Sequence, residues 1–341
     1  MKTKFFLGIE TSCDDTSMAI IKDDNGAHEI LALTSFDQTE ELKKWGGVVP
    51  EIAARNHLQK IPITLKDVFK KAQIKAQDLN CIGVTTHPGL LGPLLTGINC
   101  AKTLALLHQK PILSVNHLFA HLEAIQLTHT ISYPYIGLLI SGGHSLFVLV
   151  EASNKMKILA STIDDAAGEA FDKAGKMLGL PYPAGPIIDE YASLGEKKYD
   201  FPIGLKSSAN ANLSFSGLKT ALQVFLKDKN QLDETMLYDL CASYQDAIAK
   251  ALVLKTKYAL QNYPKLPLVV GGGVACNSEI RKQLQQKYSN VYFVAPKYCT
   301  DNGAMIANYT RINFQDALSF PECLELDGKS KFINKKEFIH G

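Results

Sequence analysis

Two histidines stand four residues apart in the stretch VNHLFAHLEA, at His117 and His121. On a helix, side chains at this spacing lie on one face, about 5–6 Å apart at Cβ, which suits one shared metal ion. The pair is not a metalloprotease motif, because that motif needs a glutamate directly after the first histidine and Leu118 stands there. Two interpretations stay open: a metal-binding pair, or two ordinary histidines on one helix.

A metal site would need a third ligand from elsewhere in the chain. Asp301 is the best candidate by context, because it lies in a polar turn, CTDN, where a helix is predicted to begin. Two neutral imidazoles and one carboxylate leave open positions on Fe(II) or Zn(II). Such a metal would contact a substrate and would not be purely structural.

Three turns carry small or acidic residues where apolar strands end. SGG at 141–143 lies between two apolar runs, where backbone N–H groups can converge on an anion. GGG at 271–273 precedes a helix that Asn277 opens, and ETSCDD at 10–15 has the same topological place as SGG. Each turn alone is more typical of a tight bend, but together they favour a nucleotide site. A P-loop motif is absent from the sequence.

Carboxylates accompany these turns. Asp165, Glu169 and Asp172 have helical spacing and share one face. They either cap helices and face solvent, or bind ribose hydroxyls. The Pro/Gly turn YPAGP after Asp172 favours the second interpretation.

These residues need a scaffold, and the hydrophobic pattern indicates one. Residues 4–21 and 135–150 each read as strand, polar turn, strand, and alternating strands and helices follow both. Helices are expected over 50–72, 166–180 and 237–263. The repetition predicts a duplicated α/β architecture of two lobes with a cleft between them.

We expect the first lobe to comprise residues 1–116 and 302–341, with the final helix packing back on it. The second lobe would comprise residues 117–301.

Composition narrows the class of protein. The chain has 341 residues with a net charge of +2, and its seven cysteines include no C-x-x-C pair. This is typical of a reduced protein with free thiols. No apolar run reaches the length of a membrane span. We therefore expect a cytoplasmic protein without a membrane partner.

Several longer motifs, in order, resemble one family. They are GIETSCDDTS, GGVVPEIAARNH, NHLFAH, LISGGHS, DDAAGEAFDKAGKMLGL, LSFSGLKTA, GGGVACNSEIR and CTDNGAMIA. The sequence is similar along nearly its whole length to the universal transferases that form tRNA threonylcarbamoyladenosine. The resemblance implies an actin-like, sugar-kinase-like two-lobed fold, the ASKHA fold.

It also implies the reaction, in which a threonylcarbamoyl group moves from threonylcarbamoyl-AMP to N6 of adenosine 37. The tRNAs are those that read codons beginning with A, and AMP leaves.

The resemblance further implies roles for individual residues. The family's metal ligands correspond to His117, His121 and Asp301, and its phosphate-side or catalytic acids to Asp14 and Asp15. Its substrate contacts correspond to Leu139, Ile140, Ser141, Gly142, Gly143, Asp172, Gly185, Asp189 and Asn277. The implied cofactor is one divalent ion per subunit, Fe(II) with Zn(II) as the alternative.

The implied partners are tRNA, threonylcarbamoyl-AMP, an inactive paralogue of the same fold and a small ATPase. The alternative interpretation is a small-molecule kinase or ATPase of the same fold, which the glycine turns alone would support.

Overall fold

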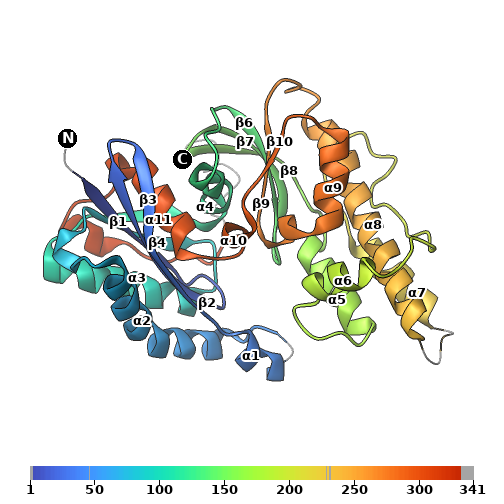
Figure 1. Cartoon of the computed structure of the whole chain (residues 1–341), viewed down its shortest axis with the longest axis horizontal. Helices are drawn as coiled ribbons and strands as arrows, with labels where there is room; N and C mark the ends of the chain where they lie inside the picture. Colours follow the sequence, from blue (N-terminus) through green and yellow to red (C-terminus); the bar gives the residue numbers. More distant parts are fainter. Residues whose placement is uncertain (1–2, 46, 228, 230–231, 332–341) are drawn as a thin grey trace. The chain divides into compact units, whose positions relative to one another are not determined.

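The structure is a computed structural model that describes residues 3–45, 47–227, 229 and 232–331. The chain divides into two compact units, and Figure 1 labels their helices and strands. Unit 1 comprises Met1–Thr130, Ser153–Lys155 and Thr300–Gly341, and unit 2 comprises Ile131–Ala152 and Met156–Cys299. Residues 117–130 thus group with unit 1. The lobe boundaries expected at 116/117 and 301/302 remain a prediction, and residues 332–341 of the expected first lobe lie outside the described part.

Unit 1 contains a mixed sheet in the order β3-β2-β1-β4-β5. Strand β1 pairs antiparallel with β2 and parallel with β4. The strands are β1 (Lys4–Glu10), β2 (Asp15–Asp24), β3 (Ala27–Asp37), β4 (Cys81–His87) and β5 (Ile112–Asn116). The β2–β3 hairpin turns at Asn25 and Gly26, both with positive φ, as a tight two-residue turn requires.

Unit 2 repeats this topology. Read from β8, its sheet has the order β8-β7-β6-β9-β10, with β6 antiparallel to β7 and parallel to β9. The strands are β6 (Tyr135–Ile140), β7 (Ser145–Ala152), β8 (Lys155–Ser161), β9 (Leu268–Gly271) and β10 (Val291–Phe293). The duplicated α/β architecture is therefore confirmed, and the ETSCDD and SGG turns occupy equivalent places between the first two strands of each sheet.

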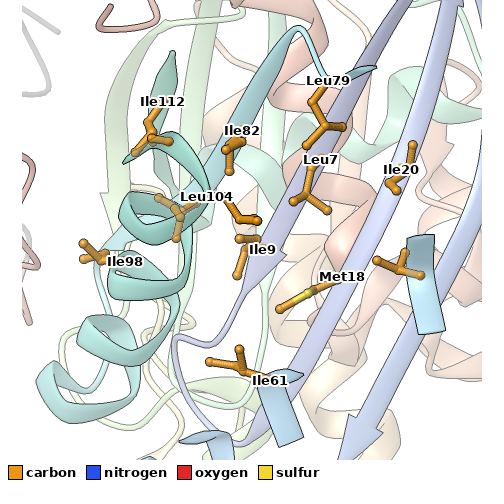
Figure 2. Packing of buried hydrophobic residues seen from close by; sticks show 14 of the residues in the cluster. Leu7, Ile9, Met18, Ile20, Ile61, Leu79, Ile82, Ile98, Leu104 and Ile112 are labelled. Atoms are coloured by element: carbon orange, nitrogen blue, oxygen red, sulfur yellow. The ribbon is translucent and has the colours of Figure 1, made fainter. Parts of the chain in front are cut away.

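Helices cover both faces of the sheet in unit 1. The helices of unit 1 are α1 (Thr39–Leu42), α2 (Pro50–Ala72), α3 (Leu91–His108), α4 (His117–Glu123) and α11 (Gly303–Ile312), of which α2, α3 and α11 pack most extensively on the strands. Figure 2 shows Leu7 and Ile9 of β1 packed with Ile61 of α2 and Leu104 of α3 in the buried core. Side chains alternate along a strand, so Phe6 and Gly8 face the other side, where α11 packs.

Two glycines allow α11 to lie directly on the sheet. A Cβ at Gly8 would overlap the backbone of Gly303 and Ala307. A Cβ at Gly303 would lie 2.5 Å from the amide nitrogen of Ala19 in β2. Backbone therefore contacts backbone here, and the start of α11 is placed within van der Waals distance of the first two strands.

The helices of unit 2 include the longest of the described residues, α8 (Glu234–Ala259), which the sequence places at 237–263. The others are α5 (Ala167–Met177), α6 (Ala184–Ala192), α7 (Ser216–Leu226), α9 (Ser278–Lys287) and α10 (Pro296–Cys299). Asp233 caps α8 by accepting a hydrogen bond from the amide of Met236 at 2.8 Å. Among the described helices, none combines the length and the apolar character that a membrane span needs.

Candidate functional site

The two histidines lie one turn apart on a short, capped helix in unit 1. Asn116, the last residue of β5, caps α4 by accepting hydrogen bonds from the amides of Leu118 and Phe119 at 2.9 and 3.3 Å. Helix α4 therefore begins at His117, which confirms the predicted helix. The Nε2 atoms of His117 and His121 lie 3.2 Å apart, and both rings are buried.

Asp301 joins this pair from 180 residues away in the chain. Its Oδ1 lies 3.0 Å from Nε2 of His121 and 3.5 Å from Nε2 of His117. The next residue, Asn302, caps α11 by accepting a hydrogen bond from the amide of Met305 at 2.9 Å. The helix that packs on β1 and β2 thus carries the third carboxylate to the two histidines.

The three ligand atoms have the spacing that a transition metal needs. Each of the three residues offers one nitrogen or oxygen atom as a ligand, and these atoms lie within 4.8 Å of one another. With metal–ligand bonds of about 2.1 Å, neighbouring ligand atoms stand roughly 3.0–3.4 Å apart. The observed separations of 3.0, 3.2 and 3.5 Å fall close to that range. His117, His121 and Asp301 therefore fit one divalent ion with open positions.

Glu10, which the sequence analysis did not assign to the site, orients His117 by contacting the ring nitrogen that faces away from the metal position. Its fully buried carboxylate has Oε2 3.1 Å from Nδ1 of His117 and accepts a hydrogen bond from Thr85 Oγ1 at 2.6 Å. Ser12 Oγ lies 3.2 Å from the same nitrogen. A carboxylate on Nδ1 leaves Nε2 to face the metal position and makes it more basic. In the sequence, the only signal for this role of Glu10 is its place as an acid at the end of an otherwise apolar strand.

The charges around this centre favour a cation. Burial and the nearby Asp301 raise the pKa of Asp14, and burial, Asp301 and Asp14 raise the pKa of Asp15 to about 8. Burial would lower the pKa of His117, but Asp301 and Glu10 outweigh it and raise the pKa to about 9. A metal ion would neutralise acids that disfavour one another's ionisation, and its binding to His117 would release the proton that this histidine retains.

The loop that carries Asp14 and Asp15 is fixed by a second residue that the sequence analysis did not assign. His57 of α2 is buried, and its Nδ1 lies 2.7 Å from Thr16 Oγ1. Its Nε2 lies 3.0 Å from the carbonyl oxygen of Cys13. The histidine therefore binds the loop on both sides of the two acids.

In unit 2, the glycine turns meet although they are far apart in the sequence. Leu139 and Ile140 are buried at the end of β6, and Ser141 accepts a hydrogen bond from the amide of Gly168 in α5 at 3.2 Å. Gly272 after β9, with a φ of 90°, lies against the carbonyl of Ile140. A Cβ on Gly142 or Gly143 would have no atom within 4 Å, so a ligand could reach this backbone.

The remaining predicted substrate residues gather at helix N-termini of unit 2. Asp172 of α5 accepts a hydrogen bond from the amide of Ala184 at 2.9 Å, one residue before Gly185. Asp189 of α6 accepts from the amide of Ser278 at 2.9 Å, and Asn277 caps α9 through the amide of Ile280 at 3.0 Å. These side chains connect α5, α6 and α9, at ends where helix N–H groups favour anions.

Other acids near these turns have structural partners. Asp164 accepts hydrogen bonds from the amides of Phe215 and Ser216 at the start of α7. Asp165 and Glu169 pair with Lys173 at 2.6 and 2.8 Å. For these carboxylates, the capping and surface interpretation fits the observed contacts.

Comparison with known proteins identifies relatives of this chain. Residues 29–308 match a family model described as "TsaD: tRNA N6-adenosine threonylcarbamoyltransferase". The chain is 43% identical over 310 residues to the tRNA N6-adenosine threonylcarbamoyltransferase of Streptococcus pneumoniae (strain Taiwan19F-14), covering 90% of this chain and 91% of that one. It is 40% identical over 340 residues to the enzyme of the same name from Lactococcus lactis subsp. cremoris (strain SK11), covering 98% and 99%.

Solved structures share the fold at low identity. The (R)-2-hydroxyglutaryl-CoA dehydratase component A of Acidaminococcus fermentans is 15% identical with a TM-score of 0.55, over 91% of this chain and 99% of that one. HypF from T. kodakarensis is 13% identical with a TM-score of 0.59, over 92% of this chain and 48% of that one. These likenesses confirm the actin-like, sugar-kinase-like class of fold. By identity and coverage, the chain belongs to the tRNA N6-adenosine threonylcarbamoyltransferase family.

Proposed function

We propose that this chain transfers the threonylcarbamoyl group of threonylcarbamoyl-AMP to N6 of adenosine 37 in tRNAs that read codons beginning with A. The observation that carries the proposal is the convergence of His117, His121 and Asp301 in a chain 40–43% identical to transferases of that name. In the reaction, a bond forms between N6 and the carbamoyl carbon. The carbon–oxygen bond to the phosphate breaks, AMP leaves with the electron pair, and N6 loses a proton.

Unit 1 would supply the reacting end of the site. A divalent ion held by His117, His121 and Asp301 would supply Lewis acidity for the carbamoyl oxygens. Glu10 holds the ring of His117 in the ligating orientation through Nδ1. Asp14 and Asp15, in the loop that His57 fixes, are the candidates to accept the proton that N6 loses.

Unit 2 would hold the adenylate. The turn from Leu139 to Gly143 offers open backbone at the end of β6, which suits the phosphate. Asp172, Gly185, Asp189 and Asn277 lie where α5, α6 and α9 meet, and their polar atoms suit ribose hydroxyls and the base.

We further propose Fe(II) as the bound ion, with Zn(II) as the alternative, because two imidazoles and one carboxylate suit both. The family resemblance is the basis for an inactive paralogue and a small ATPase as partners. All seven cysteines are free, which supports a reducing compartment, the cytoplasm.

The decisive experiment is mass analysis of tRNA nucleosides from cells that lack this protein. Threonylcarbamoyladenosine should disappear and return with the wild-type copy. Unchanged nucleoside would overturn the proposal. In vitro, release of AMP that needs both threonylcarbamoyl-AMP and tRNA supports the transferase, whereas ADP formation with a small acceptor would support the kinase alternative.

Variants of the centre test the role of the ion. H117A and H121A should each lose bound metal and the modification together. H129A, which changes an exposed histidine outside the centre, is the matched control and should retain both. Full activity in a metal-free H117A/H121A double variant would contradict the proposed role.

A further inference from the structure

Two cysteines of unit 2 that have no role in the site described above, Cys276 and Cys299, come together in the fold. Cys276 ends the 3-10 turn η4 (Gly273–Cys276), and Cys299 ends α10. The two sulfur atoms are close enough to share a hydrogen bond, and Sγ of Cys299 also donates to the carbonyl oxygen of Val294 at 3.2 Å. Cys276 is partly exposed, whereas Cys299 is buried. The pair therefore has one sulfur that solvent reaches and one behind it.

A fixed positive charge accompanies the pair. Arg281 of α9 has Nη2 3.8 Å from Cys299 Sγ. Its guanidinium is held by hydrogen bonds to the carbonyls of Ala275 at 2.6 Å and Val294 at 2.9 Å. It also lies over the ring of Phe293, 4.7 Å from the centroid. A guanidinium anchored in this way cannot turn away, so it stabilises negative charge on the sulfur atoms.

The exposed thiol has the electrostatic environment of a reactive cysteine. The hydrogen bond from Cys299 and then the charge of Arg281 outweigh burial and lower the pKa of Cys276 to about 7. Burial instead raises the pKa of Cys100 to about 12, although it is also partly exposed. At neutral pH, Cys276 therefore carries a large thiolate fraction, and Cys100 remains a thiol.

We propose that Cys276 and Cys299 form a redox-active dithiol that a hydroperoxide converts to an intramolecular disulfide. The Cys276 thiolate attacks the O–O bond, forms an S–O bond and is oxidised to a sulfenic acid, while the peroxide is reduced and leaves as water or alcohol. The Cys299 sulfur then attacks the Cys276 sulfur. The S–S bond forms, the S–O bond breaks, and hydroxide leaves with the Cys299 proton as water.

The disulfide would join η4 to α10 within unit 2. Asn277, which caps α9, directly follows Cys276. The modification would therefore tether the segment that leads into this cap. A dithiol reductant would return both thiols and their protons.

The test treats the full-length protein with hydrogen peroxide, alkylates the remaining thiols and maps peptides by mass spectrometry. A linked pair of peptides containing Cys276 and Cys299 should appear and should vanish with dithiothreitol. C276S should prevent the link and leave Cys299 reduced. C299S should leave a sulfenic acid at Cys276 that dimedone traps.

Matched variants separate this pair from general oxidation. C100S changes another partly exposed thiol and should leave the link intact. With iodoacetamide at pH 7, Cys276 should react roughly tenfold faster than Cys100, and R281Q should reduce that ratio. Because R281Q removes anchoring hydrogen bonds, R281K is a second variant that retains the charge. Peroxide that leaves Cys276 reduced, or oxidises it without a link to Cys299, would overturn the proposal.

Discussion

At the scale of single residues, the buried acid Glu10 orients His117, one of the proposed metal ligands. Its carboxylate is buried at the end of an apolar strand and contacts His117, Thr85 and the amide of Ser12. Burial would raise the pKa of Glu10, but the interaction with His117 outweighs it and the pKa is lowered. The acid is therefore ionised and fixes the ring nitrogen that remains for a metal.

Replacing Glu10 with glutamine should weaken metal binding without removing a ligand. The variant E10Q retains the shape of the side chain but loses the charge on Nδ1 of His117. Affinity should fall by roughly 10- to 100-fold, as for other changes at residues that orient a metal ligand. Competition with a chelator measures this directly. E29Q, at an exposed acid of β3, is the control, and equal affinities in E10Q and wild type would show that Glu10 does not position the ligand.

His87 predicts a specific dependence of stability on pH. Burial and then Lys329 lower the pKa of His87 from 6.5 to about 4 in the folded protein. As the pH falls from about 6.5 to 4, the unfolded chain binds a proton that the folded protein does not, so stability decreases. The loss should be on the order of 2 kcal/mol.

The variant H87Q should lack this decrease. Urea unfolding at several pH values between 4 and 7.5 would show its stability approaching or passing that of wild type as the pH falls. H129Q, at an exposed histidine, should follow the wild-type curve. Parallel curves for H87Q and wild type would contradict the assignment.

At the scale of elements, the packing of α11 on β1 and β2 determines where Asp301 lies. Gly8 and Gly303 allow backbone-to-backbone contact between helix and sheet. The cap at Asn302 then begins the helix directly after Asp301. A helix held further from the sheet would carry Asp301 away from α4.

The variant G8A should therefore affect both stability and metal affinity. Its Cβ would overlap the backbone of α11, which cannot move as a side chain would. We expect a loss of about 3 kcal/mol or more in unfolding free energy, together with weaker metal binding.

Thermal unfolding and chelator competition measure the two effects of G8A. G217A is the control, because a Cβ at this position in α7 meets nothing within 4 Å. It should be neutral or stabilise the protein by about 0.5–1 kcal/mol. A G8A protein as stable as wild type would show that the contact is not close.

At the scale of the whole molecule, the two units repeat one topology and carry different groups. The proposed metal ligands all belong to unit 1, and the glycine turns with Asp172, Asp189 and Asn277 belong to unit 2. A ligand that binds the folded state stabilises it according to its concentration relative to Kd.

Metal should therefore stabilise the protein, and it should act first on unit 1. With free ion at 100 times Kd, the gain in unfolding free energy should be about 2.7 kcal/mol. Hydrogen exchange should slow in peptides around Glu10, α4 and Asp301 before those of unit 2. H121A should lose both effects, and a gain in stability that H121A retains would place the ion elsewhere.

The sequence by itself determined the local features of this protein. The strand–turn–strand patterns, α2, α5 and α8 follow from side-chain periodicity, which a short window of sequence contains. The spacing of His117 and His121 on α4 likewise depends only on helix geometry and on the cap at Asn116. Both metal-binding histidines could be proposed from these features alone.

Tertiary structure decided how Asp301, already the candidate by sequence context, and the unassigned Glu10 reach the two histidines. Asp301 reaches the histidines because α11 packs on a surface made by Gly8. Glu10 reaches His117 because only β4 separates β1 from β5, the strand that leads into His117. In the same way, Cys276 and Cys299 meet only because η4 packs against α10. Contacts of this kind depend on how segments far apart in the sequence pack together, and a local pattern of residues does not predict that packing.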